Sequence, residues 1–75
     1  MANEHTATAP DGTVFKRTSQ NRTYTHAVLG RFIATDGTMK WAALSWCGDE
    51  TKVPSRIREF ENRRFYYNVI AVPIN

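Results

Sequence analysis

The sequence lacks the features that disulfide-bonded, secreted and membrane-spanning proteins share. Cys47 is its only cysteine, so no disulfide can form within the chain, and we expect a reducing compartment. The opening residues have neither the basic stretch nor the apolar stretch of a signal peptide. No apolar run approaches the roughly 20 residues of a membrane span. We therefore expect a cytoplasmic protein with no membrane partner.

The usual residue patterns of catalytic and metal sites are also missing. The glycines stand apart from one another, which excludes a glycine-rich phosphate loop. Asp11, Asp36 and Asp49 fall at expected turns or at a helix start, where local hydrogen bonding explains them. The hairpin register predicted below places His26 opposite Cys47, a base beside a thiol. Because no third residue would orient the histidine, we expect no enzyme, no cofactor and no metal site.

Size and charge limit the partners that the chain can have. Its 75 residues suffice for one domain with a single small core. The formal charge of +3 permits contact with phosphate or with an acidic protein and requires neither. Most of its basic residues are arginine, whose planar guanidinium favours bidentate contacts and stacking at interfaces.

The segment from Tyr24 to Cys47 predicts a hairpin around which the rest of the chain is arranged. Asp36-Gly37 between two β-rich runs is typical of a two-residue type I′ turn. We predict strands over about 22–34 and 38–46. The predicted register places Phe32 opposite Trp41, Val28 opposite Ser45 and His26 opposite Cys47 on one face, with Leu29 opposite Leu44 and Ala27 opposite Trp46 on the other.

The remaining segments complete an α+β pattern. Residues 1–10 are small and polar, which predicts a flexible tail or an extended edge segment, and residues 11–75 form the single domain. A turn at Pro10-Asp11-Gly12 leads into a short strand at 13–16. After the hairpin, capping residues and an apolar stripe at helical spacing predict a helix that ends near Asn62. An aromatic and β-branched run at 65–72 predicts the closing strand.

This β-β-β-α-β order predicts one four-stranded mixed or antiparallel sheet with one helix packed on one face. A crossover through the helix would set the closing strand parallel to the strand at 38–46 and beside the strand at 13–16. One short helix cannot cover both faces of such a sheet. We therefore expect apolar aromatic side chains on the other face to bind a partner.

Several segments resemble small, uncharacterised proteins of phages and prophages. The likeness runs through Thr8–Val14, Lys16-Arg17 and Arg22–Val28, and continues at Ser45–Gly48 and Val69–Ile74. Its motifs are structural and bring no functional residues with them. The resemblance implies an accessory protein of a mobile element that acts in the cytoplasm of a host bacterial cell. Lone proteins of this kind often inhibit host defence machinery by binding to it, as anti-CRISPR proteins do.

Two kinds of binding site follow from the aromatic and basic residues. The first is a surface for a host protein or ribonucleoprotein complex, bound stoichiometrically, because aromatic residues flanked by arginine are enriched at interface hot spots. Self-association as a homodimer would bury the same surface. The residues predicted to bind the partner are Arg31, Lys40, Trp41, Tyr66 and Tyr67.

The alternative is a small basic nucleic-acid-binding protein. Basic groups beside exposed aromatics suit phosphate contact and base stacking. If the closing strand lay beside the strand at 13–16, the basic pair that precedes it would extend the basic surface there. The residues predicted for this nucleic-acid patch are Lys16, Arg17, Arg22, Tyr24, Arg63 and Arg64.

Overall fold

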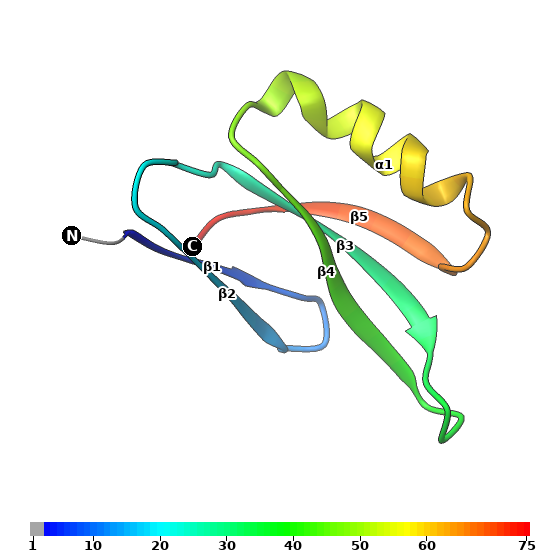
Figure 1. The fold of residues 1–75 in the computed structure, drawn as a ribbon. Helices are drawn as coiled ribbons and strands as arrows, with labels where there is room; N and C mark the ends of the chain where they lie inside the picture. Colours follow the sequence, from blue (N-terminus) through cyan, green and yellow to red (C-terminus); the bar gives the residue numbers. More distant parts are fainter. Residues whose placement is uncertain (1–2) are drawn as a thin grey trace.

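The computed structural model describes residues 3–75, which form two antiparallel sheets and one α-helix (Figure 1). One sheet pairs β1 with β2, and the other has the order β4-β3-β5. The predicted α+β class and the single helix are confirmed for these residues, whereas the single four-stranded sheet is wrong. The elements are β1 (Asn3–Thr8), β2 (Val14–Ser19), β3 (His26–Ile33), β4 (Met39–Cys47), the 3-10 helix η1 (Glu50–Lys52), α1 (Val53–Glu61) and β5 (Asn68–Pro73).

The central sheet lies between two other layers. Figure 1 shows α1 on one side of this sheet and the β1–β2 hairpin on the other. Val28 and Leu29, neighbours on β3, are fully buried on opposite faces, since Val28 packs in the cluster under α1 and Leu29 in the cluster under the hairpin. The expectation that one face would stay uncovered is therefore wrong, because the N-terminal hairpin packs against it.

The N-terminal segment is a strand from Asn3 onward. β1 pairs with β2 along its whole length, from Asn3 opposite Ser19 to Thr8 opposite Val14. Alternate side chains of this segment are buried, among them Ala7, which joins the core cluster with Leu29. Of the two alternatives predicted for residues 1–10, the extended edge segment is confirmed from residue 3 and the flexible tail is wrong there, and residues 1 and 2 lie outside the described part.

Both hairpins turn through the same sequence pattern, Ala-x-Asp-Gly-Thr, at 9–13 and 34–38. In each turn the alanine N–H donates to the threonine carbonyl at 2.8 Å, and the glycine N–H donates to the alanine carbonyl at 2.9 Å. Gly12 and Gly37 have φ of +94° and +87°, whereas Asp36 has no positive φ. The predicted two-residue turn is therefore wrong, since the loop has three residues with glycine in the left-handed position.

Because β4 contains a β-bulge, part of the central hairpin has a register different from the predicted one. The pairing of Val28 with Ser45 and of His26 with Cys47 is as predicted, but Leu29 pairs with Ala43. The extra residue, Leu44, is left without a partner and packs under α1. Because a one-residue shift exchanges the two faces of a strand, Trp41 packs on the same side as Trp46 and not on the opposite one.

β5 pairs with β3 and not with β2, which corrects the predicted strand order. It runs parallel to β4, as predicted, but β3 lies between the two strands. In this position, both faces of β5 pack against core residues. Val69 packs in the cluster under α1, whereas Ile70 and Val72 pack in the cluster under the hairpin. The end of the chain is tied to β1 by the Asn75 N–H, which donates to the Thr6 carbonyl at 2.9 Å.

The helix follows its sequence signals. Asp49 accepts a hydrogen bond from the Thr51 N–H at 3.0 Å and caps η1, and Pro54 stands in the first turn of α1. Its apolar stripe of Val53, Ile57 and Phe60 packs against the central sheet. Within residues 3–75, no helix combines the length and the apolar character needed to cross a membrane.

Candidate protein-binding surface

The segment between α1 and β5 presents two exposed aromatic side chains. α1 ends at Glu61 with Asn62 as its C-cap, and Arg64 then takes a left-handed backbone conformation with φ of +56°, a position normally held by glycine. This reverses the chain toward the sheet, where the Tyr67 N–H donates to the Arg31 carbonyl at 2.8 Å. Phe65 and Tyr67 are left 62% and 64% exposed.

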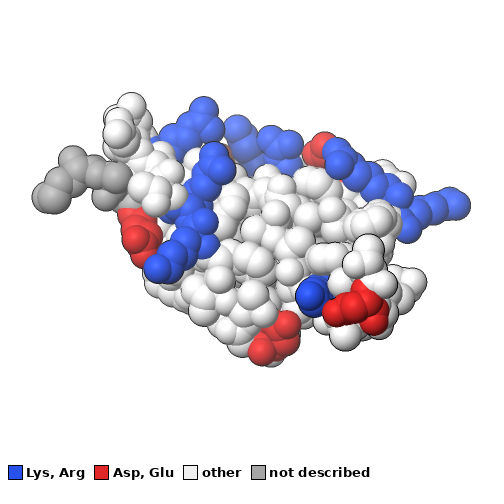
Figure 2. Space-filling view, turned by 60° about the horizontal axis from the view of Figure 1, so that its bottom comes forward, with Lys and Arg blue, Asp and Glu red and all other residues white. Residues whose placement is uncertain are grey.

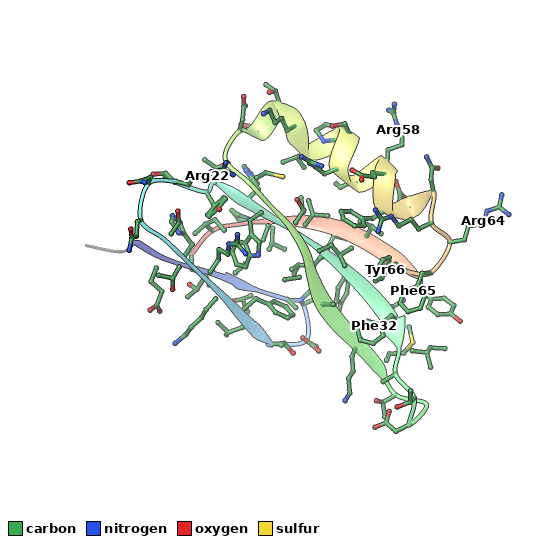
Figure 3. All side chains as sticks on the ribbon, viewed as in Figure 1. Arg22, Phe32, Arg58, Arg64, Phe65 and Tyr66 are labelled. Carbon is green, nitrogen blue, oxygen red and sulfur yellow. The ribbon has the colours of Figure 1, made fainter. Side chains whose placement is uncertain are left out.

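Tyr66, between these two residues, holds the segment in place. Its ring lies on Gly30, where an added Cβ would come within 2.7 Å of Tyr66 Cδ1. It meets Phe60 edge-on at 6.3 Å between ring centroids and Phe65 edge-on at 4.9 Å. Phe65 in turn stacks beside Phe32 at 6.2 Å, and Figure 3 shows these rings gathered at one end of the central sheet. The exposed ring of Phe65 is therefore held in place by packed rings.

We name this surface the aromatic end and define it by Phe32, Phe65, Tyr66 and Tyr67. Ile33 follows Phe32 in β3 and pairs with Met39; both side chains are exposed, on the opposite face of the strand from Phe32 because successive strand side chains alternate. Large exposed apolar side chains such as Phe65 and Tyr67 are typical of interaction sites when they lie close together.

Basic side chains lie near the aromatic end, on both faces of the central sheet. Lys40 pairs with Phe32, and Arg31 pairs with Trp41, with its guanidinium carbon 6.0 Å from the Trp41 ring centroid. Arg63 lies over the Phe60 ring at 4.9 Å. Because cations border an apolar centre, the surface is complementary to a partner that has an apolar patch with acidic groups around it.

The structure places the predicted partner-binding residues at one end of the central sheet but divides them between its two faces. Trp41, with Arg31 over its ring, packs on the hairpin side, whereas Tyr66 packs on the α1 side. Lys40 pairs with Phe32, and the Tyr67 N–H donates to the Arg31 carbonyl. Tyr66 serves mainly as packing. Sequence reasoning missed Phe65 as a surface residue because it assigned this residue to the closing strand. The signal that was available is its place directly after the helix end, where a loop exposes its side chains.

The predicted nucleic-acid patch is divided between the two ends of the molecule. Figure 3 shows Arg22 at one end and Arg64 at the other, since β5 does not lie beside β2. Tyr24 is only 8% exposed, with its ring edge-on to His5 at 5.1 Å, so it offers no face to a base. Figure 2 shows the basic side chains along the rim of the face turned to the viewer, with an uncharged centre.

The remaining patch residues lie apart from one another. Lys16 on β2 forms an exposed ion pair with Glu4 at 3.7 Å, and Arg17 stands opposite His5. Arg63 forms an ion pair with Glu59 at 3.5 Å on the last turn of α1. The predicted extension of the basic surface from Lys16 and Arg17 to Arg63 and Arg64 is therefore wrong.

His26 and Cys47 are paired as predicted, but each has other surroundings. His26 Nδ1 and the Thr25 hydroxyl are 3.0 Å apart and share a hydrogen bond. The Cys47 thiol is buried in the cluster under α1. Among residues 3–75, no three His, Cys, Asp or Glu side chains converge in a way that could hold a metal ion.

Comparisons of the chain with protein families, with curated proteins and with solved structures find no match.

Proposed function

We propose that the protein is a non-enzymatic binding protein that attaches to its target stoichiometrically through the aromatic end. The observation that supports this most is the exposure of Tyr67 and of Phe65, whose ring lies against Tyr66 and Phe32. Burial of the exposed part of each ring in an interface would contribute roughly 2–3 kcal/mol, before the cost of association. Rigid aromatic anchors lose little conformational entropy on binding, which favours a hot spot here.

The partner that fits this surface is a protein with an apolar patch bordered by carboxylates. Lys40, which pairs with Phe32, and Arg64, which precedes Phe65, provide positive charge beside the aromatic end, and the chain has a formal charge of +3. The resemblance to phage and prophage accessory proteins supports a host protein or ribonucleoprotein complex as the target, with inhibition of host defence as the outcome. Membership of the chain in this group of proteins is itself a prediction.

Capture from lysate of the host bacterium tests the proposal. The wild type is compared with Phe65→Ala plus Tyr67→Ala, and with Val14→Ala as the matched control. Val14 is 53% exposed on β2, outside the aromatic end. The double variant is expected to lose the partner by about tenfold or more, whereas the control keeps it. Equal recovery by all three proteins would contradict the proposal.

Two further measurements distinguish this proposal from nucleic-acid binding and from self-association. Binding to the partner should change little between low and physiological salt, whereas nucleic-acid binding should weaken steeply. Light scattering reports self-association. If the wild type is a dimer and the double variant is a monomer, the aromatic end joins two copies of this chain and the proposed target is wrong.

A further inference from the structure

β4 forms an open edge of the central sheet. β3 pairs with β4 on one side and with β5 on the other, and no strand of residues 3–75 pairs with the outer side of β4. Ala42 and Ala43 on β4 are partly exposed, whereas Ala27 on the central strand β3 is fully buried. Figure 1 shows the first part of β4 extending beyond the β1–β2 hairpin, toward the β3–β4 turn.

The hydrogen bonds of the hairpin show which backbone groups of β4 point outward. The Ala34 N–H donates to the Thr38 carbonyl at 2.8 Å, so these two residues bond to each other across the hairpin. In an antiparallel pair, every second residue bonds to the partner strand. From Thr38 to the bulge, the even-numbered residues of β4 therefore bond to β3, and the odd-numbered ones direct their N–H and C=O outward. These outward-directed residues are Met39, Trp41 and Ala43.

Two other strand edges carry features that discourage pairing, and this edge carries few. β2 has Lys16 and Arg17, both exposed, and charged side chains on an edge oppose the addition of another strand. On β5, Pro73 pairs with His26 at a position whose N–H would point outward, and proline has no N–H. On β4, residues 41–46 include neither a charged residue nor a proline.

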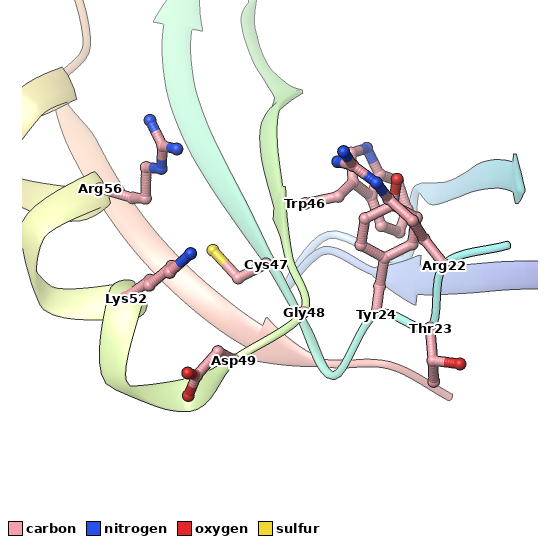
Figure 4. Close-up of a pocket in the computed structure, with 9 residues that line it drawn as sticks. All are labelled: Arg22, Thr23, Tyr24, Trp46, Cys47, Gly48, Asp49, Lys52 and Arg56. Carbon is pink, nitrogen blue, oxygen red and sulfur yellow. The ribbon is translucent and has the colours of Figure 1, made fainter.

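The regular part of this edge ends at the bulge. Leu44 interrupts the pairing, so the ladder of outward groups runs over residues 39–43. Beyond it, Figure 4 shows the side chains of Trp46 and Cys47 on opposite sides of β4. Trp46 lies beside Tyr24 at 6.1 Å between ring centroids, and Cys47 is buried in the cluster under α1. The first five residues of β4 are therefore the part that can accept a strand.

Positive charge lies on both faces of this edge. Lys40 is exposed on the α1 face, and Arg31 lies on the hairpin face with its guanidinium carbon 6.0 Å from the Trp41 ring centroid. Within residues 3–75, neither Lys40 nor Arg31 forms an ion pair. The carboxylate of Asp36 is engaged by hydrogen bonds within the β3–β4 turn. Because β4 has no acidic residue, a second copy would bring no counter-charge, and an acidic partner suits this edge better.

We propose that residues 39–43 of β4 bind an extended acidic segment of another protein, which adds to the central sheet as a strand. The backbone ladder provides the affinity, and Lys40 provides the preference for a carboxylate opposite it. Trp41 contacts the alternate side chains of the added strand on the other face. Phe65 and Tyr67 take no part in this ladder. The inference therefore goes beyond the proposed function, and either can fail without the other.

NMR titration of isotope-labelled protein with the blocked peptide Thr-Glu-Val-Glu-Val-Glu-Thr tests the proposal. The peptide should shift the amide resonances of Met39, Trp41 and Ala43 to saturation and slow their hydrogen exchange. The Ala42 amide, which already bonds to β3, should change little. The absence of any saturable shift up to about 5 mM peptide would overturn the proposal, as would shifts centred on residues 65–67.

Two control peptides test the ladder and the charge separately. A peptide that is N-methylated at its three central residues cannot complete the ladder, and one with lysine in place of glutamate has the wrong charge. Each should bind at least about tenfold more weakly than the parent peptide. Equal binding of the methylated peptide would refute strand addition, and equal binding of the lysine peptide would refute an acidic partner.

Variants of the chain identify the edge. Ala43→Pro removes an outward N–H without removing a bond to β3 and should abolish binding. If thermal unfolding shows that this variant does not fold, the methylated peptide decides the same point. Lys40→Gln should weaken binding by about threefold, and Lys52→Gln, a matched loss of charge on η1, by less than about 1.5-fold. Equal weakening would refute the site.

A dilution series without peptide tests the second copy as the occupant. If the resonances of residues 39–43 shift as the protein is concentrated, two copies pair through β4, and the proposed acidic partner is wrong. Resonances that do not depend on protein concentration are the expected result.

Discussion

The ring of Tyr66 lies against the backbone of Gly30, and this contact sets the position of the aromatic end. An added Cβ at Gly30 would lie 2.7 Å from Tyr66 Cδ1 and 2.6 Å from Leu44 Cδ1, distances that real Cβ atoms do not show. Glycine in the middle of a central strand weakens the strand, so its presence marks a close approach. Here the approach is that of the segment holding Phe65 and Tyr67.

Gly30→Ala should therefore lower the free energy of unfolding by about 1–3 kcal/mol, the usual effect of overpacking. Urea denaturation measures this loss. The double variant with Leu44→Ala relieves one of the two clashes, so its loss should be smaller than the sum of the two single losses. If the losses of the two single variants simply add up in the double variant, Leu44 is not a side chain that clashes with the added methyl group.

Arg64 should lower the folding stability while contributing to partner binding. Its φ of +56° is a left-handed conformation that disfavours side chains with a Cβ. Arg64→Gly should raise the free energy of unfolding by about 0.5–1 kcal/mol and, in the same protein, weaken partner binding through the lost charge. Thermal unfolding and a partner titration check the two effects. Arg58→Gly, in the interior of α1, is the matched control and should destabilise by about 1 kcal/mol.

The two hairpin turns should respond alike to loss of their glycines. Gly12 and Gly37 have similar positive φ and no atom within 4 Å of an added Cβ, so only backbone strain opposes a side chain. Alanine at either position should lower the free energy of unfolding by about 1–2 kcal/mol, and asparagine by less. Urea denaturation of the four variants decides this. A harmless Gly37→Ala with a harmful Gly12→Ala would contradict the shared turn geometry.

Acid should weaken the fold through three aspartates. The pKa of Asp11, Asp36 and Asp49 is lowered from the ordinary value of 3.8, because each carboxylate accepts hydrogen bonds from the threonine two positions later. A lowered pKa in the folded state means that this stabilisation is complete above the unfolded-state pKa. It is lost as the pH falls through the folded-state values.

Unfolding at a series of pH values from about 5 down to about 2 measures this loss. The triple variant with asparagine at all three positions keeps hydrogen-bond acceptors there but cannot titrate. Its stability should therefore fall less steeply with acid than that of the wild type. Parallel pH profiles would show that these carboxylates do not contribute.

Local signals in the sequence predicted the local structure. The Asp49 cap, Pro54 in the first turn and the apolar stripe specified the helix, because each acts within a few residues. The pairing of His26 with Cys47 was also predictable. The length of the turn between them was not predictable, since Asp-Gly occurs in both two-residue and three-residue loops. The extra residue at the Leu44 bulge compensates for the longer loop, so the pairs beyond the bulge match the prediction although the loop does not.

Long-range packing determined what the sequence pattern could not predict. β1 buries Ala7 and, directly after the strand, Ala9, whose small side chains give little apolar signal, so the segment resembled a tail. β5 is apolar on both faces, and only the structure shows that it lies beside β3. The aromatic end depends on this placement. The exposed Tyr67 was predicted as a surface residue, whereas Phe65 was missed because the sequence pattern assigned it to the closing strand.

Site-specific photo-crosslinking tests the central claim most directly. A benzophenone amino acid replaces Phe65 in one protein and Val14 in another, since both positions are exposed and they belong to different surfaces. Irradiation with the captured partner should give a covalent complex at one-to-one ratio from position 65 and none from position 14. A complex formed from position 14 alone would show that the partner binds away from the aromatic end, and the account would be wrong.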